Sequence, residues 1–141
     1  MDNSIFKGGM ALKSESKIII LSSIVLLAII ASGILIKSYL DVTTEKFITE
    51  LDTLEKYIND DKWNKAHEMV MDLNNKWEKT ENIWTLFTNH HEIDSISISL
   101  KTLAEYIAGQ DKTESKASLV SLKHFISHIP KMEKLSLKNI F

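Results

Sequence analysis

The chain has 141 residues with 44% hydrophobic and 26% charged side chains, one Pro, four Gly and no Cys. This composition excludes a disordered chain, a loop-rich or all-β fold, a disulfide framework and any Cys-based site. All 17 basic residues are Lys, the formal net charge is −2, and from Asp41 onward 13 Lys stand against 17 acidic residues, a net charge of −4. Because nucleic-acid binding needs a basic face, we expect no nucleic-acid partner.

An uncharged run follows a short N-terminal tail of residues 1–17. From Ile18 to Ile36 the sequence reads IIILSSIVLLAIIASGILI, with Lys17 and Lys37 on either side. At ~1.5 Å per residue, a helix over this run is ~28 Å long, close to the hydrocarbon thickness of a bilayer. Serine hydroxyls inside such a helix can bond back to its backbone. We therefore predict one transmembrane helix over residues 18–36, with the lipid bilayer as its partner.

The alternative for this run is a cleaved signal peptide. The apolar part of a signal peptide is normally ~7–15 residues long and ends at an A-x-A-like site. The run is longer here, and Ala28 and Ala31 are spaced A-x-x-A, which favours an uncleaved signal-anchor.

The lysines around the run predict its orientation. Three lysines precede the run, namely Lys7, Lys13 and Lys17, whereas two follow it within the next fifteen residues, Lys37 and Lys46. An excess of Lys marks the cytoplasmic side. We expect a single-pass protein of the cell membrane with its N-terminus in the cytoplasm and residues 40–141 outside as one helical domain.

Apolar residues recur at helical spacing in the first half of this domain. No Gly or Pro lies between Ile36 and Ile58, so the transmembrane helix either continues into the first domain helix or breaks at Thr43 and Thr44. A second helix is predicted to start near Asp61. Its three Trp are interpreted as core, with a partner groove or a membrane-proximal contact as the alternatives. The two stripes are Phe47, Leu51, Leu54 and Ile58, then Trp63, Ala66, Val70, Leu73, Trp77, Thr80, Trp84 and Phe87.

Two further helices are predicted in the second half. Asn89 with Glu92, and Asp111 with Glu114, have the spacing of a capping box, Gly109 is expected to end the third helix, and Pro130 is expected to stop the fourth. The I-S-I-S alternation of residues 96–99 also fits a strand, but the neighbouring segments favour helix. The stripes are Ile93, Ile96, Leu100, Leu103 and Ile107, then Leu119, Leu122, Ile126 and Ile129; the apolar tail is Leu135, Leu137, Ile140 and Phe141, expected to pack back on the domain.

An internal echo suggests how these helices pair. Residues 51–58 read LDTLEKYI and residues 100–107 read LKTLAEYI, so that five of eight positions are identical at an offset of 49 residues. Two helical hairpins packed as a bundle are the simplest explanation. Chance is the alternative, because the match is short and rich in Leu.

Few residues suggest chemistry. His124 and His128 share one helix face, as two metal ligands would, and His91, Glu92 and Asp94 cluster near the predicted start of the third helix. These five are metal-ligand candidates only if the two regions meet, and capping and the helix dipole are the stronger explanation for them. The motifs H-E-x-x-H, G-x-S-x-G and G-K-[ST] are absent. We expect no enzyme activity, no catalytic residue and no cofactor.

Several short motifs of the domain follow the predicted anchor in a recognisable order. They are Trp77, Trp84, NHHEID at 89–94, LKTLAEYI at 100–107 and HIPKMEKLSLKNIF at 128–141. With these motifs the chain resembles the bacterial domain-of-unknown-function family 4363 (DUF4363), small membrane-anchored proteins of spore-forming Firmicutes. The resemblance implies a helical domain on a membrane anchor and no known activity, and it makes His91, Glu92, Asp94, His128 and Asn139 the positions to watch.

The sequence as a whole predicts an all-α fold, one N-terminal transmembrane helix followed by a bundle of about four helices. The expected function is that of a non-enzymatic interaction or accessory module on the outer side of the membrane, which holds another membrane protein or a second copy of itself. A ligand- or metal-sensing helical bundle is the alternative.

Overall fold

The computed structural model describes the backbone of residues 4–138 and the side chains of residues 16–130. It contains the helices α1 (Ser4–Asn59), α2 (Trp63–Trp84), α3 (His90–Ala108) and α4 (Lys112–Lys138), and no strand within residues 4–138. This confirms the predicted all-α fold, and the I-S-I-S residues lie in α3. The chain divides into two compact units, one ending at Ile36 and one beginning at Lys37.

The first unit contains the apolar run, here called the apolar segment (residues 18–36). Twelve large apolar side chains between Ile18 and Leu35 are each at least 44% exposed. Two serines satisfy their hydroxyls within the helix, as predicted: Ser23 Oγ donates to Ile19 O at 2.9 Å and Ser32 Oγ donates to Ile29 O at 2.8 Å. By length and composition, this part of α1 is able to cross a membrane.

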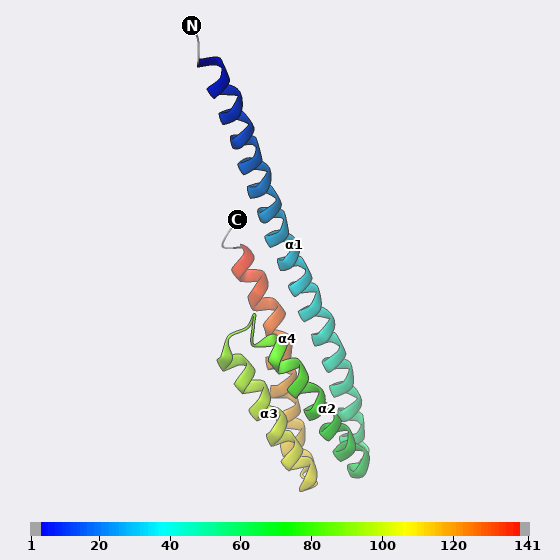
Figure 1. Ribbon diagram of the computed structural model, residues 1–141. Coiled ribbons are helices and arrows are strands. Elements are labelled where there is room, and N and C mark those ends of the chain that lie inside the picture. Colours follow the sequence, from blue (N-terminus) through cyan, green and yellow to red (C-terminus); the bar gives the residue numbers. More distant parts are fainter. Residues whose placement is uncertain (1–3, 139–141) are drawn as a thin grey trace. The chain divides into compact units, whose positions relative to one another are not determined.

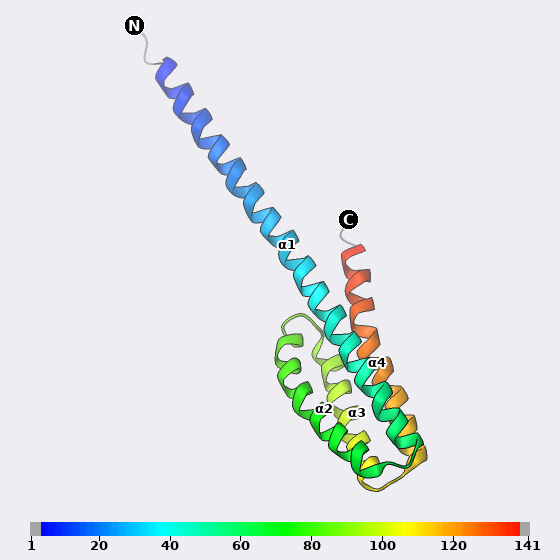
Figure 2. The ribbon, with the colours of Figure 1, turned by 90° about the vertical axis from the view of Figure 1, so that its right-hand side faces the viewer.

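The second unit is a four-helix bundle made of residues 37–59 of α1 together with α2, α3 and α4 (Figures 1 and 2). α3 packs against both α2 and α4. Phe47 of α1 contacts Trp77 of α2, and Lys123 of α4 forms an ion pair with Asp52 of α1. Each helix therefore touches two neighbours, and the four apolar stripes meet along one axis. Thr43 and Thr44 do not interrupt α1.

The turns that close the two hairpins, α1–α2 and α3–α4, are copies of each other. The backbone N–H of Lys62 donates to Tyr57 O at 2.9 Å, and that of Asp111 donates to Tyr106 O at 2.9 Å. Asp61 and Gln110 share a φ of 56°. Both turns are Schellman motifs with the left-handed residue at the same place. The offset is 49 residues, the same as in the sequence echo.

The buried positions repeat at the same offset, so the echo extends beyond the eight matched residues. The bundle therefore consists of two equivalent hairpins, as predicted. At one equivalent position the first hairpin has Ala66 and the second has Ser115. The buried pairs are Phe47 and Ile96, Leu51 and Leu100, Leu54 and Leu103, Ile58 and Ile107, Ala66 and Ser115, Val70 and Leu119, Leu73 and Leu122, and Trp77 and Ile126.

Replacing Ser115 with alanine is expected to stabilise the bundle. Ser115 is fully buried and its Oγ has no hydrogen-bond partner among the described residues, whereas Ala66 fills the equivalent place without a polar atom. Removing an unsatisfied buried hydroxyl should raise the free energy of unfolding by about 1–2 kcal/mol, and Ala66→Ser should lower it by a similar amount. Denaturant unfolding of the full chain in detergent measures both. A stabilising Ala66→Ser would contradict the equivalence of the two sites.

Two predictions about helix ends and burial were wrong. Pro130 does not stop the fourth helix, since α4 runs to Lys138 with Pro130 inside. A proline inside a helix loses its own N–H bond and crowds the carbonyl four residues before it, but the residues KMEKL that follow favour helix. Gly109 ends α3 as predicted, as its C-cap with an ordinary φ of −76°, and Gln110 is the left-handed residue of the turn. Trp63 is half-buried, because it lies in the first turn of α2, beyond the innermost layer of the core.

The stripe of the second helix also ends earlier than predicted. Thr80 is half-buried, and Phe87 lies in the turn after α2 with 37% exposure. The side chains of Leu135 and Leu137, and Ile140 and Phe141 as a whole, lie outside the described residues, so the predicted packing of the tail stays a prediction.

A groove between α1 and α2 as the candidate functional site

The metal-ligand candidates lie on α3 and α4. Asn89 caps α3, where its Oδ1 accepts from the backbone N–H of His91 at 3.0 Å. His91 and Asp94 are exposed, and Glu92 is half-buried. Asn139 lies outside the described residues. These positions fit the helix-start interpretation of the acidic residues.

The two candidate histidines on α4 do come together. The rings of His124 and His128 stack with centroids 5.8 Å apart and an interplanar angle of 19°. Among the residues whose side chains are described, no group of three His, Asp or Glu is suited to hold a metal ion. The structure thus pairs these two rings without bringing a third ligand to them.

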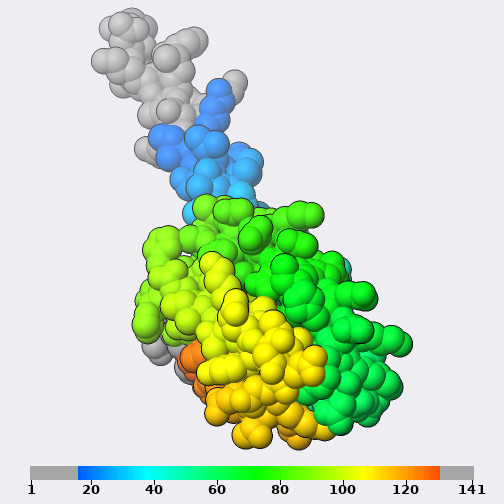
Figure 3. Space-filling view, turned by 90° about the horizontal axis from the view of Figure 1, so that it is seen from below, coloured from blue at the N-terminus to red at the C-terminus, as the bar shows by residue number. Residues whose placement is uncertain are grey.

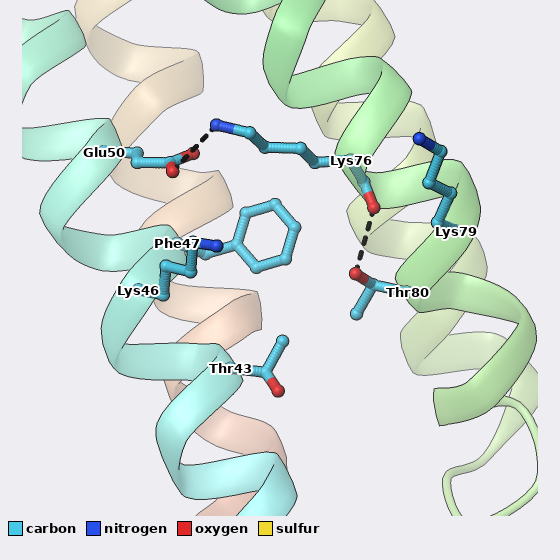
Figure 4. Close-up of a pocket in the computed structure, with 7 residues that line it drawn as sticks. All are labelled: Thr43, Lys46, Phe47, Glu50, Lys76, Lys79 and Thr80. Carbon is cyan, nitrogen blue, oxygen red and sulfur yellow. Dashed lines mark hydrogen bonds and ion pairs between the residues drawn. The ribbon is translucent and has the colours of Figure 1, made fainter.

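A groove lies on the bundle between α1 and α2 (Figure 4). It has a volume of ≈ 220 Å³, and we call it the α1–α2 groove. The two helices run antiparallel, so residues before the turn face residues after it. The lining residues are Thr43, Lys46, Phe47 and Glu50 of α1, and Lys76, Lys79 and Thr80 of α2.

The floor of the groove is apolar and firmly held. The ring of Phe47, 5% exposed, meets Trp77 edge to face with centroids 5.9 Å apart, and Trp77 meets Trp84 in the same way at 5.5 Å. Trp77 Nε1 donates to Ser97 Oγ on α3 at 2.7 Å, and that hydroxyl donates to Glu81 Oε1 at 3.1 Å. Contacts that reach from α1 to α3 therefore fix the position of the floor.

The walls carry more positive than negative charge. Lys76 Nζ lies 2.6 Å from Asp72 and 2.9 Å from Glu50, and the hydrogen bonds that it donates to these two carboxylates hold the pKa of Lys76 above its ordinary value. Lys46 and Lys79 are exposed and form no ion pair among the described residues. The lining has three Lys and one Glu, a formal charge of +2, in a domain whose net charge is −4.

The other flank of α1 shows the opposite arrangement. Lys123 of α4 lies 2.7 Å from Asp52 and 2.6 Å from Glu55, so its charge is matched by two carboxylates. Burial lowers the pKa of the Lys123 ammonium, but the hydrogen bonds to Asp52 and Glu55 outweigh this effect and the pKa lies above its ordinary value. Lys123 thus differs from Lys46 and Lys79. Other exposed lysines of the bundle, among them Lys101 and Lys116, also form no ion pair among the described residues, so the α1–α2 groove is distinguished by having two such lysines beside an apolar floor.

The groove was not predicted from the sequence, because Lys46 and Lys79 occupy polar positions on two amphipathic helices. The signal that was available is the hairpin itself, because an antiparallel pair with a turn at residues 60–62 sets Phe47 opposite Trp77 and Glu50 opposite Lys76.

Comparison with known proteins gives the family and nothing more. Neither the curated proteins nor the solved structures include a match to the chain. A family model described as Domain of unknown function (DUF4363) matches residues 34–140, which covers most of the chain and nearly all of the bundle, and the chain therefore belongs to this family.

Proposed function

We propose that the protein is a single-pass, membrane-anchored, non-enzymatic interaction module whose bundle lies outside the cytoplasm. Its α1–α2 groove binds an acidic segment of another membrane protein. The observation that carries the proposal is a pair of exposed lysines, Lys46 and Lys79, which form no ion pair among the described residues and lie beside the apolar floor at Phe47.

The anchor supports this proposal. Burying large apolar side chains is favourable by about 1.5–3 kcal/mol each, and the twelve exposed ones of the apolar segment have no cover within their own unit. A segment of this length and composition matches the bilayer core. The lysine excess before residue 18 favours the proposed orientation.

The chemistry of the groove selects its occupant. Unpaired Lys on a wall attract carboxylates, and an apolar floor favours an aliphatic or aromatic side chain between them. A chain held at a membrane meets other membrane proteins at a raised effective concentration, so a modest groove is sufficient for binding. We therefore expect a helical or extended partner segment that carries Asp or Glu on either side of an apolar residue.

The test is photocrosslinking of the full chain in its native membranes, with a photoreactive residue in place of Thr43 at the groove. We expect one other membrane protein in near-stoichiometric amount, crosslinked through a peptide that contains Asp or Glu. The double charge reversal Lys46→Glu with Lys79→Glu should abolish the crosslink. Lys101→Glu with Lys116→Glu is the matched control, since both lysines are exposed elsewhere on the bundle.

Three outcomes would contradict the proposal. The crosslink could survive the groove reversal, the control reversal could abolish it equally, or the product could be a dimer of this chain, which would make a second copy the occupant.

A further inference from the structure

Exposed apolar side chains on the bundle gather at one end. The large exposed ones among the described residues from 37 onward are Tyr39, Val42, Met71, Ile83, Leu86, Phe87, Ile98 and Val120. Three of these lie within five residues, at the end of α2 and in the loop of residues 85–89, here called the α2–α3 loop. Leu86, 74% exposed, is the most exposed large apolar side chain among the described residues.

The α2–α3 loop is well fixed, so this exposure has a structural cause. The backbone N–H groups of Leu86, Phe87 and Thr88 donate to Ile83 O, Trp84 O and Trp84 O at 3.2, 2.9 and 2.9 Å. Trp84 itself is fully buried. The hydrogen-bonded turn follows the buried Trp84 directly, and Leu86 and Phe87 lie on the outside of the bundle.

The α2–α3 loop lies at the end of the bundle opposite the α1–α2 and α3–α4 turns (Figures 1 and 2). α2 has 22 residues, or about 33 Å at ~1.5 Å per residue, and it runs back along α1 from the turn at residues 60–62. The contacts Glu50–Lys76 and Phe47–Trp77 fix how the two helices pair. About two further helical turns lead from Phe47 to Leu40 and from Trp77 to Trp84, so Trp84 lies level with Leu40.

Chain connectivity brings this end close to the apolar segment. Only four residue steps separate Ile36 from Leu40, and even a fully extended chain covers at most ~14 Å in four steps. Any bilayer that holds the apolar segment must therefore lie near the end of the bundle that carries Leu86.

The opposite end has a different surface. Figure 3 views the bundle from below, with the turn regions of the α1–α2 and α3–α4 hairpins towards the viewer in green and in yellow to orange. The far end of the bundle is polar, whereas the end near Leu40 carries exposed apolar side chains. The exposed residues of the two turns include Asn59, Asp60, Asp61, Lys62, Gln110 and Asp111.

We propose that the α2–α3 loop is a second membrane contact, in which Leu86, Phe87 and Ile83 insert into the interfacial layer of the bilayer that holds residues 18–36. The inference rests on the proposed membrane anchoring, and its occupant is a lipid surface. Aromatic and aliphatic side chains on a rigid turn suit the boundary between headgroups and acyl chains. Two attachments, one through the helix and one through the loop, restrict how the bundle tilts over the membrane.

The absence of Cys makes a direct test possible, because one introduced Cys is the only labelling site. The full chain carrying Leu86→Cys is labelled with an environment-sensitive fluorophore. It is reconstituted at about one chain per vesicle into phosphatidylcholine and phosphatidylglycerol vesicles that contain nitroxide lipids. Ile98→Cys, at 65% exposure on the wall of α3, is the matched control, and Leu27→Cys reports on the apolar segment.

We expect blue-shifted emission and strong loss of fluorescence at position 86, comparable with the loss at position 27, and no loss at position 98. Equal fluorescence at positions 86 and 98, with position 27 quenched, overturns the loop contact while the anchoring stands. An unquenched position 27 overturns the anchoring and the loop contact together. A blue shift at position 86 that appears only when many chains share a vesicle identifies a second copy as the occupant and overturns the lipid contact.

Discussion

Replacing Trp77 with alanine is expected to lower the free energy of unfolding of the bundle by about 3–5 kcal/mol. Trp77 is 3% exposed, and it contacts Phe47 of α1, Trp84 of its own helix and Ser97 of α3. The substitution removes the largest side chain at the meeting point of three helices and leaves a cavity. It also leaves the Ser97 hydroxyl without its indole donor.

Denaturant unfolding of the full chain in detergent, followed by far-ultraviolet circular dichroism, measures this effect. Trp63→Ala is the matched control, because the same side chain is removed from a half-buried place at the start of α2. Its cost should be less than half that of Trp77→Ala. Equal costs would contradict the position of Trp77 at the centre of the helix contacts.

Two lysines in the apolar segment, Leu27→Lys with Ile30→Lys, are expected to release the chain from the membrane. A Lys at the centre of a transmembrane helix costs about 2.5–3.5 kcal/mol. Two therefore cost about 5–7 kcal/mol, which offsets much of the favourable insertion free energy of the apolar side chains on the same scale. The measurement is extraction of membranes with alkaline carbonate. The unmodified chain should stay in the pellet and the double variant should appear in the supernatant.

The matched control for this prediction is Ile98→Lys with Val120→Lys, the same kind of exchange at exposed positions of the bundle. This variant should stay in the pellet. An N-terminal epitope on the unmodified chain separates the anchor from a cleaved signal peptide. Loss of the epitope from the mature chain would contradict the anchor, and so would extraction of the unmodified chain by carbonate.

Most of the fold could be predicted from the sequence because the helices are strongly amphipathic. The stripes of α3 and of residues 47–58 of α1 are buried at every predicted position. The start of α3 at Asn89 and the start of α4 after Asp111 were also predicted, since both side chains accept a hydrogen bond from the first turn of the helix that follows. Local signals of this kind do not depend on the rest of the chain.

What could not be predicted depends on contacts between helices or on competing local terms. α4 continues through Pro130 because the residues that follow favour helix strongly enough to offset the cost of the proline. The periodicity of apolar residues gives no measure of either quantity. Burial of Trp63 depends on how far the neighbouring helices extend beside it. The groove depends on which lysine of α1 faces which lysine of α2, and this follows only from the register of the hairpin.

The repeated hairpin has a consequence for the segment that joins the two copies. A bundle of two equivalent hairpins is the single-chain counterpart of a dimer, in which each half supplies the same buried positions to a shared interior. Residues 85–87 link the two halves. None of these three residues belongs to the buried core positions that repeat between the hairpins. Interior packing therefore does not require an apolar side chain at Leu86, which is 74% exposed, and the surroundings of the bundle determine which amino acid suits that position.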